Sequence, residues 1–235
     1  NLPENTKVID GTNKTLLPGL FDNHVHASRS DGLMHLAAGV TSVRDMANSR
    51  ELIEMRKEFD QNINIGPRVV TMAGFIDQKG PFAGPGLTIT NVEEGIKAIE
   101  DYAKDGYHQI KLYSSIDPSW VKPMAEKAHE LGLKLSGHIP AHMLAEDAIK
   151  DGYDEIQHVN MVVLNFLSDS IDSRTPKRFS EVAAHAYKLD LKGEKFQSFV
   201  KLLKEKDIEL DPTVSIFEGM FTSKSDDPDP QFEMI

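Results

Sequence analysis

The sequence of 235 residues contains no cysteine, so disulfide bonds and thiolate metal sites are excluded and the redox compartment stays open. It also lacks an excess of basic charge, because 26 Lys and Arg stand against 37 Asp and Glu, a formal net charge of -11 at pH 7. No lysine- or arginine-rich block occurs, which argues against nucleic acid and anionic membranes as partners. No apolar run approaches the roughly 18 residues that a transmembrane helix needs. We therefore expect a soluble globular domain, whose location could be cytoplasmic, periplasmic or secreted.

Short apolar segments alternate with amphipathic segments along nearly the whole chain. The predicted strands cover residues 17–23, 41–44, 68–73, 109–113, 134–137, 155–158 and 209–214. The predicted helices cover residues 49–62, 91–104, 118–131, 141–150 and 194–206. Such regular alternation predicts an α/β fold with a parallel sheet, either a (β/α) barrel or an open doubly wound sheet. No Gly-x-Gly-x-x-Gly motif follows the first strand, which weakens the case for an open dinucleotide-binding sheet.

Four histidines lie at the ends of predicted strands. His24 and His26 are separated by one residue, so they point to the same face of the first strand, about 7 Å apart along the chain. His138 and His158 close the fifth and sixth predicted strands. The carboxyl ends of all strands of a parallel barrel open on one face, so we expect the four imidazoles to meet there. Unpartnered buried imidazoles are costly, which favours a shared metal site over packing.

A lysine inside a predicted strand is the second unusual feature. Lys111 lies between Ile110 and Leu112 in "QIKLYSS", where an amine is costly unless it is paired or modified. The alternative is an edge residue whose amine reaches solvent. Tyr113 and Ser114 follow at the strand end, and we expect them to face the pocket mouth as substrate contacts.

One further pair of charges follows the second predicted strand. Arg44 and Asp45 are adjacent in "VRDM", and we interpret them as an internal ion pair rather than as catalytic groups.

The segments "LLPGLFDNHVHA", "AAGVTSVRDM", "QIKLYSS", "SGHIPA" and "DEIQHVN" occur in the order expected for the amidohydrolase superfamily. More narrowly, they resemble its imidazolonepropionase-like and prolidase-like branch, from about Val8 to Val214. The resemblance implies a metal-dependent hydrolase on a distorted (β/α)8 TIM-like barrel. It also implies cleavage of a C–N bond in a small-molecule substrate, such as an amide, a cyclic amide or a dipeptide.

Carried over by position, the resemblance also implies a binuclear metal site. His24 and His26 would hold the more buried ion, and His138 and His158 the more exposed one. Lys111 would be carboxylated on its amine and bridge both ions. Imidazole and carboxylate-type ligands suit Zn²⁺, with Mn²⁺ or Ni²⁺ as alternatives.

The sequence departs from the family at its catalytic base. That base is an aspartate at the end of the eighth strand, and we assign no residue of this sequence to the role. Asp211 lies in the seventh predicted strand, one strand too early. Asp226, Asp227 and Asp229 fall in a "SDDPDP" run that is typical of an exposed loop.

We therefore expect the chain to be a piece of a longer polypeptide. Residues 1–15 would be the lead-in from an N-terminal β-sandwich, and residues 16–215 would form barrel strands one to seven, with an insertion at about 161–192. Residues 216–235 would be an irregular tail. A barrel without its eighth strand has open edges, which favour homo-oligomers or pairing with another chain.

Two alternative functions stay open beside the binuclear hydrolase. One is a mononuclear, deaminase-like member of the superfamily. Deaminase-like relatives lack the bridging lysine, so Lys111 argues against this reading. The other is a catalytically silent metal-binding fragment that keeps the ligands without the base. Under the main reading the parent protein is the enzyme, and this segment alone is inactive.

Overall fold

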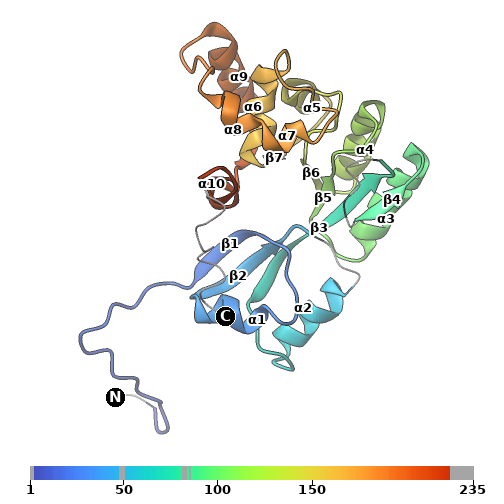
Figure 1. The fold of residues 1–235 in the computed structure, drawn as a ribbon. Helices are drawn as coiled ribbons and strands as arrows, with labels where there is room; N and C mark the ends of the chain where they lie inside the picture. Colours follow the sequence, from blue (N-terminus) through green and yellow to red (C-terminus); the bar gives the residue numbers. More distant parts are fainter. Residues whose placement is uncertain (1–2, 48–50, 81–83, 85, 223–235) are drawn as a thin grey trace.

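The structure is a computed structural model that describes residues 3–47, 51–80, 84 and 86–222. Within these residues, parallel strands form one sheet in the order β1-β2-β3-β5-β6-β7-β8, with β4 paired to β3. Their bounds are β1 Leu20–Val25, β2 Val40–Asp45, β3 Arg68–Gln78, β4 Leu87–Ile89, β5 Gln109–Leu112, β6 Lys134–Gly137, β7 Glu155–Gln157 and β8 Glu209–Asp211. In the described part of the chain β1 and β8 do not pair, so the barrel is nearly closed and has an open seam (Figure 1). The predicted incomplete (β/α) barrel is confirmed.

Most of the helices lie outside the curved sheet, whereas α10 lies on its open side, between β1 and β7 (Figure 1). The bounds of the helices are α1 Gly32–Ala37, α2 Leu52–Asp60, α3 Val92–Lys104, α4 Pro118–Glu130, α5 Ala145–Lys150, α6 Val159–Leu167, α7 Lys177–Ser180, α8 Val182–Ala186, α9 Glu194–Glu205 and α10 Val214–Thr222. None of these described helices combines the length and apolarity that crossing a membrane would require.

The residues around α3 show how the sequence sets an element boundary. The Asn91 side chain accepts a hydrogen bond from the backbone N–H of Glu94 (2.9 Å), and the Glu94 carboxylate accepts one from the Thr90 backbone N–H (2.7 Å). These bonds satisfy donors that a helix start leaves without partners. Ala98 and Ile99 then face the core, and Gly106 follows the helix with φ of +80°.

We expect Asn91→Ala to lower the free energy of unfolding by about 1 kcal/mol, because the cap hydrogen bond is lost. Urea unfolding followed by circular dichroism measures this change. Asn91→Asp is the matched control, since Asp caps a helix about as well as Asn. An alanine variant as stable as the wild type would contradict the cap assignment.

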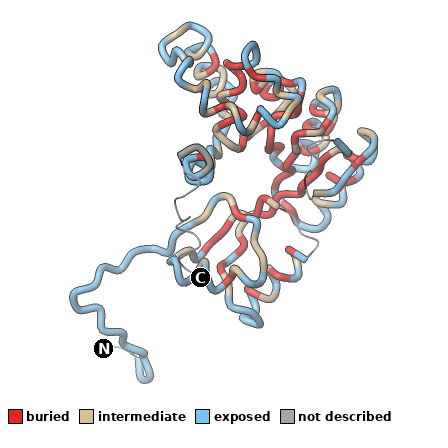
Figure 2. Tube along the Cα trace, in the orientation of Figure 1, coloured by how far each residue is buried: buried red, intermediate tan, exposed pale blue. Residues whose placement is uncertain are grey.

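The two faces of the strands differ in polarity. Outward residues such as Ile110, Leu135 and Ile156 are buried in the larger apolar cluster, which also contains residues of helices α3 to α6, α8 and α9. A smaller cluster joins α2 to strands β1 to β3. Buried positions concentrate in the strands and on the inward sides of the helices (Figure 2). The inward strand positions carry polar side chains, among them Gln109 and Lys111 in β5, and Glu155 and Gln157 in β7. A barrel interior of this kind can hold a polar site.

The C-terminal part of the barrel differs from the prediction. The strand predicted over 209–214 ends at Asp211, because Pro212 has no N–H for the ladder and Thr213 turns the chain with φ of +45°. Residues 216–222, predicted as irregular, belong to helix α10. The rest of the predicted tail, 223–235, lies outside the described residues.

The predicted insertion at 161–192 is largely helical. It contains most of α6 together with α7 and α8. At the other end, residues 3–19 form neither helix nor strand and extend away from the barrel (Figure 1).

Candidate metal centre

The four predicted histidines lie together at the carboxyl ends of the strands. His24 is in β1, His26 follows it, His138 follows β6 and His158 follows β7. The distance between ring centroids is 5.7 Å for His24 and His26, 5.0 Å for His24 and His158, and 4.5 Å for His138 and His158. Residues up to 134 positions apart thus form one continuous group of imidazoles.

Three of these rings are held through Nδ1. His24 Nδ1 lies 2.6 Å from Asp211 Oδ2, His138 Nδ1 lies 2.9 Å from Ser114 Oγ, and His158 Nδ1 lies 2.7 Å from Thr213 Oγ1. An oxygen partner at Nδ1 fixes the ring orientation and leaves Nε2 as the donor atom for a metal.

The environment lowers the pKa of three of the rings. Burial, Lys111 and His24 lower the pKa of His26 to about 4. Burial lowers the pKa of His138 well below its ordinary value, and the neighbouring His158 and Lys111 act in the same direction. Burial, His24 and Lys111 lower the pKa of His158 to about 3. Neutral imidazole is the form that ligates metals. His158 also has φ of +71° and ψ of +124°, a strained backbone conformation of the kind found at functional sites.

Lys111 is buried inside the barrel, with 1% of its surface exposed. The alternative of an edge lysine that reaches solvent is therefore wrong. Its Nζ lies 5.3 Å from the centroid of the Phe75 ring, and no carboxylate in the described part of the chain forms an ion pair with it. Burial lowers the pKa of Lys111 to about 8, although Asp211, Asp45 and Glu155 act in the opposite direction.

The two predicted substrate contacts both lie against His138. The Tyr113 ring centroid is 3.9 Å from that of His138, and Ser114 is fully buried with its hydroxyl on His138 Nδ1. Tyr153 contacts the same residue, because its hydroxyl donates to the His138 carbonyl at 2.8 Å. Ser114 therefore orients the His138 ring, and substrate contact by either residue stays a prediction.

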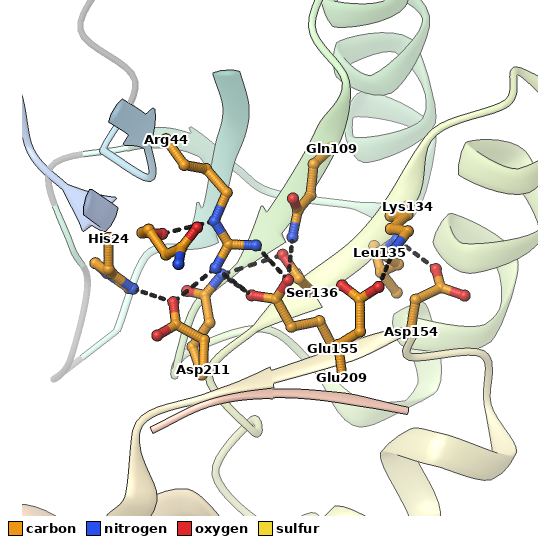
Figure 3. Close-up of polar contacts among 12 residues, drawn as sticks. His24, Arg44, Gln109, Lys134, Leu135, Ser136, Asp154, Glu155, Glu209 and Asp211 are labelled. Carbon is orange, nitrogen blue, oxygen red and sulfur yellow. Dashed lines mark hydrogen bonds and ion pairs between the residues drawn. The ribbon is translucent and has the colours of Figure 1, made fainter. Parts of the chain in front are cut away.

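The structure also contains a charge network that the sequence analysis missed (Figure 3). Arg44 Nη1 lies 2.6 Å from Glu155 Oε2, and Arg44 Nη2 lies 3.1 Å from Glu155 Oε1 and 2.8 Å from Asp211 Oδ2. The predicted pairing of Arg44 with Asp45 is wrong, because neighbouring strand residues point to opposite faces. Asp45 accepts instead from the backbone N–H groups of Ala27 and Ala47.

The period-two pattern of polar residues was the available signal for this network. Gln109 and Lys111 alternate with Ile110 and Leu112, so both polar side chains had to share the inner face. Gln109 and Gln157 each donate to Glu155 at 3.2 Å. Of the residues in this pattern, only the lysine was predicted to belong to the site.

The donor set suits a divalent metal, because it combines neutral imidazoles with a buried amine that could be converted to a carboxylate-type ligand. The present arrangement does not complete a ligand shell: among the described residues, no three His, Asp or Glu side chains are placed to hold one ion.

Comparison with known proteins identifies the family. The sequence profile of the amidohydrolase family matches residues 15–171, well over half of the chain. The chain therefore belongs to the amidohydrolase family, as the resemblance implied. No curated protein sequence is significantly similar to it.

The fold is similar to those of several solved hydrolases. Bottromycin amidohydrolase has a TM-score of 0.59 and 22% identity, over 73% of this chain and 38% of that chain. A Xaa-Pro dipeptidase with bound methionine in its active site has a TM-score of 0.54 and 21% identity, over 82% and 64%. Molinate hydrolase has a TM-score of 0.59 and 16% identity, over 95% and 60%. The chain thus spans less than two thirds of each of these proteins.

Proposed function

We propose that the whole protein is a metal-dependent hydrolase that cleaves a C–N bond in a small molecule. The observation that carries this proposal is the grouping of four histidines and a buried lysine at the carboxyl ends of the strands, in a chain of the amidohydrolase family. The carboxyl ends of barrel strands are where enzymes of this architecture place their chemistry.

In this proposal His24 and His26 would hold one ion, and His138 and His158 would hold a second. Lys111, carboxylated on Nζ, would be a ligand shared by both. Zn²⁺ suits this donor set, with Mn²⁺ or Ni²⁺ as alternatives. When bound, two divalent ions polarise a carbonyl and supply a nucleophilic water near neutral pH.

The residues of the chain prepare the site for this chemistry. Asp211, Ser114 and Thr213 orient three of the rings through Nδ1. The buried ammonium of Lys111 would first lose a proton to solvent, and the neutral amine would then join CO₂ by a new N–C bond with release of a second proton. This carboxylation would replace a costly buried cation with an anion suited to bridging two metal ions.

The candidate substrates are an amide, a cyclic amide or a dipeptide. The Xaa-Pro dipeptidase among the similar structures supports the prolidase-like reading, and the fold alone does not choose between these substrates. The mononuclear, deaminase-like alternative leaves the buried Lys111 without a role. The silent metal-binding fragment differs from the main proposal in activity rather than in ligands.

Elemental analysis of the 235-residue chain after reconstitution with zinc and bicarbonate tests the site. We expect about two zinc ions per chain, and about one or fewer in His26→Ala and in His138→Ala. His129→Ala is the matched control, because His129 lies on α4 and pairs with Asp154 instead. A wild-type chain that retains no zinc would contradict the proposal. A panel of dipeptides, N-acyl amino acids and cyclic amides, assayed on the parent protein, then separates an enzyme from a silent binder.

A further inference from the structure

We propose that Arg44 is a positioning residue for the candidate metal centre, acting on His24 through Asp211. This inference depends on the proposed function for the identity of what His24 binds. The geometry on which it stands is formed by side chains of this chain alone (Figure 3).

One carboxylate oxygen joins the arginine to the histidine. Asp211 Oδ2 accepts from Arg44 Nη2 at 2.8 Å and lies 2.6 Å from His24 Nδ1. Arg44 comes from β2, His24 from β1 and Asp211 from β8. Since β1 and β8 share no backbone ladder in the described residues, these side-chain bonds connect the two edges of the seam.

The Arg44 guanidinium is held by three acceptor residues, which are Glu155, Asn23 and Asp211. Glu155, which is 1% exposed, accepts from both Nη1 and Nη2, and the Asn23 carbonyl accepts from Nε at 2.6 Å. Gln109 and Gln157 hold the Glu155 carboxylate in turn. The planar fork of arginine can serve all these acceptors at once, whereas the ammonium of lysine cannot match this geometry.

The consequence for His24 is a defined tautomer. A carboxylate can only accept, so the short contact with Asp211 requires the proton on His24 Nδ1, and Nε2 is then the ring nitrogen that can bind a metal. Arg44 also separates the negative charges of Glu155 and Asp211. Without it, Asp211 would lose its second partner and face an uncompensated like charge, and its carboxylate could turn toward solvent.

The test compares Arg44→Met and Arg44→Lys with the wild-type chain. Nitrogen-15 NMR of the metal-free protein reports the tautomer of His24, which we expect to be protonated on Nδ1 in the wild type and mixed in Arg44→Met. Competition with a chromophoric chelator reports the dissociation constant for zinc, which we expect to rise about 10- to 100-fold in Arg44→Met and less in Arg44→Lys.

Arg29→Met is the matched control. Arg29 also binds two carboxylates, Glu51 and Glu58, but at the exposed surface beside α2. Its loss should change neither the tautomer of His24 nor the affinity for zinc.

Asp211→Asn provides a second route if Arg44→Met does not fold. It keeps the size of the side chain and removes the charge, so it should reproduce the loss of the tautomer preference. An unchanged tautomer and unchanged zinc affinity in the folded Arg44 and Asp211 variants would overturn the inference. A wild-type chain that binds no zinc would instead overturn the proposed function, while the NMR measurement would still decide the role of Arg44.

Discussion

Lys111→Met is expected to reduce bound zinc from about two ions per chain to one or fewer. The free energy of unfolding of the metal-free chain should stay the same or rise by up to about 2 kcal/mol. The side chain is buried, and in the described part of the chain no carboxylate forms an ion pair with it. Methionine has a similar volume and no charge, so the desolvation cost of the cation disappears. Elemental analysis and urea unfolding measure the two effects on the same preparations.

A loss of bound zinc together with unchanged or higher stability distinguishes a metal ligand from a residue that only stabilises the fold. If Lys111 only stabilised the barrel, its replacement would lower stability and leave the zinc content of the folded fraction unchanged. Lys134→Met is the matched control, because Lys134 lies on the neighbouring strand β6 with an exposed amine paired to Glu209. A Lys111→Met chain that still binds about two zinc ions would exclude the bridging role.

The order of the seven strands on the main path of the sheet was predictable because each of them leaves a local signal. The run at 134–137 begins after Leu133 and ends before a histidine, and β6 has these bounds. Helix α3 begins directly after Asn91, the first residue of the helix predicted over 91–104. The histidines could be placed together from sequence because a parallel barrel brings all strand ends to one face.

Helices and strands whose apolar residues do not lie on one face were not predicted from the sequence. Helix α6, Val159–Leu167, is apolar on nearly all sides, so its sequence shows no stripe with a helical period. The three-residue strand β4 is equally hard to recognise from so few positions.

The hydrogen-bond and ion-pair partners of the site residues could not be predicted from the sequence, for another reason. Asp211 reaches His24 across the seam, and Glu155 reaches Arg44 over 111 positions of sequence. Periodicity predicts which face a residue occupies, but not which residue lies opposite. The pairing of Arg44 therefore had to come from the three-dimensional structure.

Arg178→Ala is expected to lower the free energy of unfolding by about 3 kcal/mol or more. Arg178 comes from α7, within the predicted insertion, yet only 1% of its surface is exposed. Its Nη2 donates to the Ile139 carbonyl and contacts Met161 Sδ, and its own carbonyl accepts from Asn160. Alanine would leave both a cavity and a buried carbonyl without this donor. Urea unfolding measures the loss, and Lys177→Ala, which removes an exposed amine paired with Glu181, should change stability by less than about 0.5 kcal/mol.

A comparison of Arg178→Met with Arg178→Ala separates the two causes of the lost stability, the cavity and the lost polar contacts. Methionine fills much of the same volume, so a variant clearly more stable than Arg178→Ala would assign most of the loss to the cavity. Two equally unstable variants would assign it to the polar contacts instead. Ile139 directly follows His138, so in either case the insertion stabilises the segment that carries this candidate ligand. An alanine variant within about 0.5 kcal/mol of the wild type would show that the insertion is a surface excursion without this role.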